Sequence, residues 1–194
     1  MTKGYVLFSR KNLNPKKCKM EVRKTQLKAY MISWYGPFHS IEEVKEWEKF
    51  NSSSNLYLLQ GKRKSAKLFS YYCGQTKRDA ATRFKDKYHC IRQMPNQLNI
   101  WIGTFTHRFK TEDINVVENL LIHLLSLGIN EMQLLNERNL YFQSQNSVFL
   151  QNQWHNPNFH KQPDDTIKLA LPEMAVYDAT NNALKISKRL RPID

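Results

Sequence analysis

The sequence predicts an α+β fold with a small central antiparallel sheet of three strands, flanked by helices and carrying N- and C-terminal extensions. Two observations support this prediction. Short apolar runs typical of strands, the first two separated by a basic turn, occur at 56–59, 68–73 and 98–105. Segments with apolar residues at helical spacing lie around them, at 41–47, from Asp79 onward and at 114–127.

The N-terminal extension is rich in Lys and Arg, and short strands are predicted in it at 5–8 and 30–34. A short amphipathic helix follows at 41–47. Ser40 stands where a helix cap is expected, and Glu43 occupies the capping-box position three residues later.

The central segment reads as a hairpin followed by helices and a third strand. The second strand of the hairpin closes at Gly74. Asp79 then starts a helix whose apolar stripe extends to Tyr88. After the third strand, Asp113 is expected to cap a longer helix that ends at Gly128.

Three regions follow from these elements. The basic extension with short strands and a helix covers 1–54, the core covers 55–140, and a covering extension occupies 141–194. The last region contains two further possible strands, 148–150 and 175–177.

The charge balance points to a polyanionic partner. The 194 residues include 30 Lys and Arg against 17 Asp and Glu, a net charge of +13. Lys and Arg beside phosphates release condensed counterions, which favours nucleic acid as the partner. The alternative is a basic protein whose charge only aids solubility.

The cysteines and apolar runs bound the location. Cys18, Cys73 and Cys90 show no C-x-x-C spacing, which argues against a disulfide framework and a cysteine zinc site. No apolar run approaches the roughly 20 residues that span a bilayer. We therefore expect a cytoplasmic protein without a membrane partner.

Two positions on the predicted helices suit phosphate chemistry. Glu118 borders the buried stripe of its helix, where a carboxylate needs either an arginine or a metal ion beside it. Arg83 and Lys87 are four residues apart and would project from one helix face toward a phosphodiester. A solvated basic face is the alternative for that pair.

Tyr57 and Tyr72 lie on adjacent predicted strands. A phenol has a pKa near 10 and is a poor base unless a cation lowers it, so packing alone is the other interpretation of these side chains. The six histidines show no H-E-x-x-H spacing.

In chain order these residues stand in five short motifs. They are Asn55-Leu56-Tyr57, Tyr72-Cys73-Gly74, Thr82-Arg83-Phe84, Glu118-Asn119-Leu120 and Leu134-Leu135-Asn136. Together they resemble the motifs of the GIY-YIG nuclease superfamily, which includes restriction endonucleases, over about 55–140. The first motif retains only its Tyr, and Cys73 replaces the Ile of the second. Asn130 has the spacing from Glu118 seen in several members, whereas Asn136 has the better local context.

The resemblance implies a metal-dependent endonuclease with one Mg²⁺ or Mn²⁺ held by Glu118. Arg83 would stabilise the transition state, and Lys87 would bind a phosphate oxygen or assist the base. Tyr57 would orient or deprotonate the attacking water, with Tyr72 in the same network.

Asn136 or Asn130 would hold the active-site loop in register. DNA is the expected substrate, and RNA stays open. Cations expected around the site to grip the backbone are Lys62, Arg63, Lys64, Lys67, Lys77 and Arg78. Cutting both strands with one site per chain favours a homodimer. The competing hypothesis is a non-catalytic nucleic-acid-binding or protein-interaction protein on a nuclease-like scaffold.

Overall fold

The computed structural model describes residues 26–51, 56–105, 110–129, 133–160 and 170–187. The strands in these ranges are β1 (Leu27–Phe38), β2 (Leu56–Lys62), β3 (Ser70–Gln75), β4 (Asn96–Phe105), β5 (Ser147–His155), β6 (Met174–Asp178) and β7 (Ala183–Ser187). The helices are α1 (Ile41–Glu48), α2 (Ala80–Phe84), α3 (Thr111–Gly128) and the 3₁₀ helix η1 (Cys90–Gln93). The strand predicted at 5–8 lies outside the described residues.

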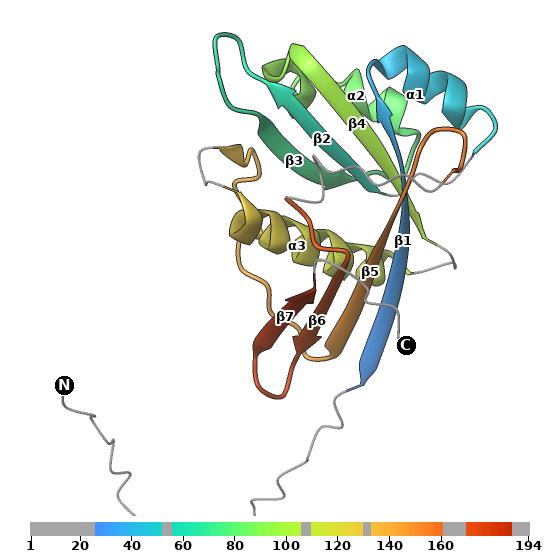
Figure 1. Ribbon diagram of the computed structural model, residues 1–194. Helices are drawn as coiled ribbons and strands as arrows, with labels where there is room; N and C mark the ends of the chain where they lie inside the picture. The colour runs from blue at the N-terminus through green and yellow to red at the C-terminus, as the bar shows by residue number, and fades with distance from the viewer. Residues whose placement is uncertain (1–25, 52–55, 106–109, 130–132, 161–169, 188–194) are drawn as a thin grey trace, which may run out of the picture.

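All seven strands belong to one mixed sheet with the order β3-β2-β4-β1-β5-β6-β7 (Figure 1). Neighbouring strands are antiparallel except for β1 and β5, which are parallel. The predicted fold, a small three-stranded sheet flanked by helices, is therefore wrong. The three predicted core strands occupy one end of a much larger sheet.

The physical reason is the long central strand β1. It pairs with β4 on one side and with β5 on the other, so that Trp34 lies opposite both Gly103 and Trp154. Local periodicity shows that a segment is extended, but it does not identify a partner more than a hundred residues away. Strands from 1–54 and 141–194 thus join the same sheet as those from 55–140.

The sheet curls into a half-barrel around α3, and the smaller helices lie on its outer face (Figure 1). Leu56, Leu58 and Cys73 point inward and pack against the apolar side of α3. Tyr57 and Leu59 alternate with them and point outward to α1 and α2. Because both faces are covered, β2 is buried along almost its entire length.

The helix predicted at 41–47 is confirmed as α1. Ser40 caps it, accepting a hydrogen bond from the N–H of Glu43 at 3.1 Å. The Glu43 carboxylate in turn accepts from the N–H of His39 at 2.8 Å.

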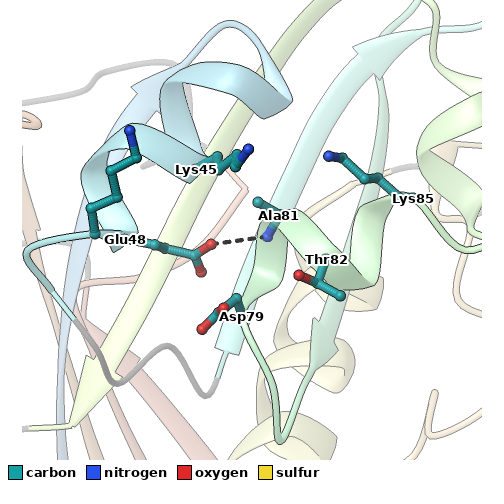
Figure 2. Close-up of a pocket in the computed structure, with 7 residues that line it drawn as sticks. Lys45, Glu48, Asp79, Ala81, Thr82 and Lys85 are labelled. Carbon is teal, nitrogen blue, oxygen red and sulfur yellow. Dashed lines mark hydrogen bonds between the residues drawn. The ribbon is translucent and has the colours of Figure 1, made fainter.

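The helix predicted from Asp79 to Tyr88 is much shorter than expected. It ends at Phe84, and Tyr88 is exposed. Asp79 makes no side-chain cap; instead the buried Glu48 carboxylate accepts from the N–H groups of Ala80 and Ala81, at 2.7 and 3.0 Å. Figure 2 shows the bond to Ala81. The end of α1 therefore fixes the start of α2.

The long helix α3 starts earlier than predicted, after Lys110, and Asp113 is not its cap. The Asp113 carboxylate lies in the first turn and accepts from Lys28 Nζ at 2.7 Å and from Tyr30 Oη at 2.8 Å. These contacts attach the start of α3 to β1. The predicted strands 148–150 and 175–177 are confirmed within β5 and β6.

Candidate active site

Two tyrosines lie side by side on the outer face of the sheet near its edge. Tyr57 of β2 and Tyr72 of β3 stack with their ring centroids 6.1 Å apart. Gly74 pairs with Tyr57 across the two strands, and a Cβ at Gly74 would lie 2.6 Å from Tyr57 Oη and 2.8 Å from Tyr72 Cε1. A side chain at that position would therefore displace both rings, which explains why glycine stands there.

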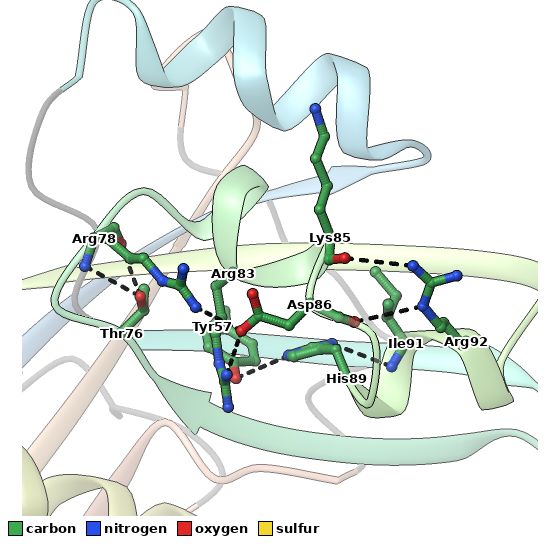
Figure 3. A network of polar contacts seen from close by, with 9 residues as sticks. All are labelled: Tyr57, Thr76, Arg78, Arg83, Lys85, Asp86, His89, Ile91 and Arg92. Atoms are coloured by element: carbon green, nitrogen blue, oxygen red, sulfur yellow. Dashed lines mark hydrogen bonds and ion pairs between the residues drawn. The ribbon is translucent and has the colours of Figure 1, made fainter.

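The Tyr57 hydroxyl faces His89, which precedes η1 (Figure 3). His89 Nδ1 accepts the backbone N–H of Ile91 at 3.2 Å, so that nitrogen carries no proton. Burial lowers the pKa of His89 to about 4, which keeps the imidazole neutral. Its proton is therefore on Nε2, and Nε2–H donates to Tyr57 Oη at 3.0 Å.

The two phenols keep their protons at neutral pH. Burial raises the pKa of Tyr57 above its ordinary value, and that of Tyr72 to about 12. The Arg83 guanidinium lies close enough to Tyr57 to oppose this shift. Tyr57 and Tyr72 contact each other through their stacked rings.

Arg83 is half-buried on α2 and shares a carboxylate with a second arginine. Arg83 Nη1 and Arg78 Nη2 each contact Asp86 Oδ2 at 2.5 Å (Figure 3). The hydrogen bond from Arg83 lowers the pKa of Asp86. Two guanidinium groups with one carboxylate leave one positive charge next to the tyrosines, which suits an incoming phosphate.

Glu118 lies on the inner side of the edge strand, on α3. Its Oε2 accepts from Gln75 Nε2 at 3.0 Å, and the same amide donates to Asn115 Oδ1 at 2.5 Å. Burial raises the pKa of Glu118, although hydrogen bonds from Gln75 oppose the shift. No Lys or Arg of the described ranges forms an ion pair with Glu118. The salt bridge considered from the sequence is therefore not formed among these residues.

Tyr72 and Glu118 line one surface hollow of about 370 Å³. Tyr72 belongs to the outer face, but β3 is the edge strand, so its ring lines the same hollow as Glu118. Asn136 completes the wall. Its side chain donates to the Cys73 carbonyl at 2.8 Å and accepts the Cys73 N–H at 3.0 Å, which holds the following turn against β3.

Several predicted residues lie elsewhere. Because α2 ends at Phe84, Lys87 does not share a helix face with Arg83; it is exposed, and its ammonium lies 5.3 Å from the Tyr88 ring. That part of the prediction is wrong. Asn130 lies outside the described residues.

The predicted basic residues divide into two groups. Lys77 and Arg78 follow β3, and Arg78 shares the Asp86 carboxylate with Arg83. The others belong to the opposite end of the hairpin, where Lys62 lies over the Phe69 ring at 4.8 Å and the loop residues are exposed. Five residues of strand, roughly 16 Å, separate Tyr57 from Lys62. The hairpin loop therefore does not surround the site as predicted.

Sequence reasoning missed His89 and Gln75. The six histidines show no metal-binding spacing, and a single histidine such as His89 belongs to no motif that would mark it in the sequence. Gln75 follows the second motif directly, and its role emerges only when α3 packs against β3.

The donor set suits some metals better than others. No group of three or more His, Cys, Asp or Glu side chains gathers in the part of the chain that the structure describes. A zinc site with its three or four protein ligands is thus not built from these residues. One carboxylate in an open hollow fits Mg²⁺ or Mn²⁺, since magnesium commonly keeps several of its waters.

Among the described residues, none of the helices has both the length and the apolar character to cross a membrane. Comparison with protein-family models, with curated proteins and with solved structures found no match to this sequence.

Proposed function

We propose that this protein is a metal-dependent endonuclease that hydrolyses phosphodiester bonds of DNA. The observation that carries the proposal is the convergence of Tyr72 and Glu118 on one hollow, with Tyr57 stacked on Tyr72 and Arg83 close to Tyr57. These four residues come from four separate elements. They are also the residues that carry the resemblance to the GIY-YIG nucleases.

Glu118 would hold the metal ion, because it is a partly buried carboxylate without an ion pair among the described residues. A bound Mg²⁺ or Mn²⁺ would supply Lewis-acid stabilisation of charge at the scissile phosphate. Arg83 retains donors beyond its bond to Asp86, and it would stabilise the additional negative charge of the transition state.

The tyrosines would act on the attacking water. Tyr72 lines the hollow, and its phenol would orient a water or a phosphate oxygen there. Tyr57 is almost fully buried, so it supports Tyr72 from behind. This arrangement favours an orienting role for both phenols, and loss of a proton by Tyr72 would require a cation in the hollow to lower its pKa.

The substrate class rests on charge. A net charge of +13 favours a polyanion, and Arg78 and Lys77 lie beside the site to contact its backbone. RNA, which has the same phosphate backbone, is the alternative substrate. A cytoplasmic location and a homodimer that cuts both strands are parts of the same proposal.

The test is cleavage of supercoiled plasmid with Mg²⁺ or Mn²⁺, stopped by EDTA. Glu118→Ala should abolish cutting and leave DNA binding nearly unchanged. Glu112→Ala is the matched control, because it removes an exposed carboxylate from the first turn of the same helix and should cut as the parent does. Cutting by Glu118→Ala at the parent's rate would refute the metal role of this residue.

A non-catalytic nucleic-acid-binding protein on the same scaffold is the second candidate, because the positive charge alone would support it. It predicts DNA binding by the parent without metal-dependent cutting. A protein-interaction role predicts neither, so the plasmid assay and a binding assay together separate the three functions.

A further inference from the structure

Part of the hollow is lined by residues that belong to none of the five sequence motifs. A turn at 137–139 lines the hollow together with Glu118, and Arg138 is the middle residue of this turn. All three residues of the turn are exposed. Within the described residues, Arg138 forms no ion pair. By contrast, Arg78 and Arg83, the arginines on the tyrosine side, both contact Asp86.

The turn is fixed at both ends. Before it, Asn136 makes two hydrogen bonds with the Cys73 backbone, and the Leu135 N–H donates to the Tyr71 carbonyl at 2.8 Å. After it, the Leu140 carbonyl accepts from His123 Nδ1 of α3 at 2.7 Å. A flexible loop would pay ordering entropy when it bound a ligand, whereas a turn anchored to β3 and α3 presents its side chain in advance.

The backbone bends at Arg138, and the next residue, Asn139, has a φ of +64° in the left-handed region. Asparagine tolerates this conformation better than most residues. Arg138 thus lines a hollow that also holds a carboxylate suited to a metal.

We infer that Arg138 binds a backbone phosphate of the DNA strand in this hollow, on the Glu118 side of Tyr72. The inference rests on the proposed function. A planar guanidinium without an acidic partner can donate two parallel hydrogen bonds to phosphate oxygens. The strand would then be held at two places, by Arg83 near the tyrosines and by Arg138 in the hollow.

The test measures affinity for a short duplex in EDTA, where no cutting occurs, over a range of salt concentrations. Arg138→Ala should weaken binding about tenfold, as expected for one charge-assisted hydrogen-bond contact. It should also reduce the slope of log affinity against log salt by about 0.9, the value for one phosphate contact. Arg138→Lys should keep the salt slope and lose only part of the affinity.

Lys185→Ala is the charge-matched control, because Lys185 is exposed on β7, the edge strand at the other end of the sheet. An equal change of slope in this variant would assign the effect to overall charge and overturn the inference. If the parent cuts plasmid but Arg138→Ala leaves the salt slope unchanged, the inference about Arg138 is overturned and the proposed function stands. A parent that neither binds nor cuts DNA would overturn the proposed function as well.

Free phosphate offers the same oxygens as a DNA backbone, so a competition experiment with inorganic phosphate distinguishes the two ligands. Inorganic phosphate at the concentration of the duplex phosphate groups should leave duplex binding unchanged. Competition that disappears in Arg138→Ala would assign the hollow to free phosphate and overturn the DNA assignment.

Discussion

The two sides of edge strand β3 differ in whether their charged and polar side chains have partners within the protein. On the outer side, Tyr57 accepts a hydrogen bond from His89, and Arg83 is held by Asp86. On the inner side, Glu118 receives its side-chain hydrogen bond from the neutral amide of Gln75 and stands in an open hollow. The first side is complete within the protein, whereas the second has a carboxylate without a cation among the described residues.

This difference suggests a division of labour. Groups that must be oriented in advance belong on the complete side, where burial and hydrogen bonds fix their geometry. A charge that a ligand completes belongs on the open side, because a carboxylate already paired with an internal arginine would bind a cation less readily. The predictions below test the two sides separately.

The largest effect is expected on the complete side. Arg83→Ala should lower the cleavage rate at saturating DNA by about 10²–10³, the usual cost of removing one donor to the transition state. The measurement is single-turnover cleavage of a labelled duplex. Arg63→Ala removes an equal charge from the hairpin loop and should leave that rate unchanged. Equal rates for the Arg83 variant and the parent would remove Arg83 from the chemistry.

His89 should make the complete side sensitive to acid. Burial lowers its pKa from 6.5 to about 4, so below pH 6.5 the unfolded chain binds a proton that the folded protein excludes. The free energy of unfolding should therefore fall by about 3 kcal/mol between pH 6.5 and 4 and then level off.

Urea unfolding at a series of pH values measures this effect. His89→Asn should flatten that part of the profile, and the exposed His160→Asn should reproduce the parent's curve. A parent whose stability is constant over this pH window would show that His89 is not held neutral by burial.

A smaller effect is expected on the open side. Gln75→Ala removes the side-chain hydrogen bond that orients Glu118, so Mn²⁺ affinity should fall about 10–100-fold, as for other residues that support a metal ligand. Calorimetric titration measures the affinity, and Gln153→Ala on the distant strand β5 is the control. Unchanged Mn²⁺ binding in the Gln75 variant, beside lost binding in Glu118→Ala, would limit Gln75 to a packing role.

Much of the local structure was predictable. The helix at 41–47 with its Ser40 cap, and the strands at 56–59, 98–105 and 148–150, follow from periodicity and short-range capping. The errors occur where a distant residue replaces a local partner. Glu48 caps α2 in place of Asp79, and the Asp113 carboxylate accepts from Lys28 of β1 and does not cap α3.

The candidate site shows the same division. Side chains with distinctive chemistry, such as Glu118 at a core edge and Arg83 on a short helix, were visible in the sequence. The side chains that form hydrogen bonds with the candidate residues and orient them were not visible in the sequence. His89 and Gln75 have no motif of their own, and each reaches its partner only after the chain has folded back.

The sequence by itself determined the extended and helical segments, the positive charge and the candidate residues, because these depend on neighbours within a few positions. Only the tertiary structure decided the seven-stranded sheet and the meeting of Tyr72 with Glu118 around its edge. Strand partners are selected by the burial of whole faces and by pairing between distant segments, and local spacing does not encode that choice.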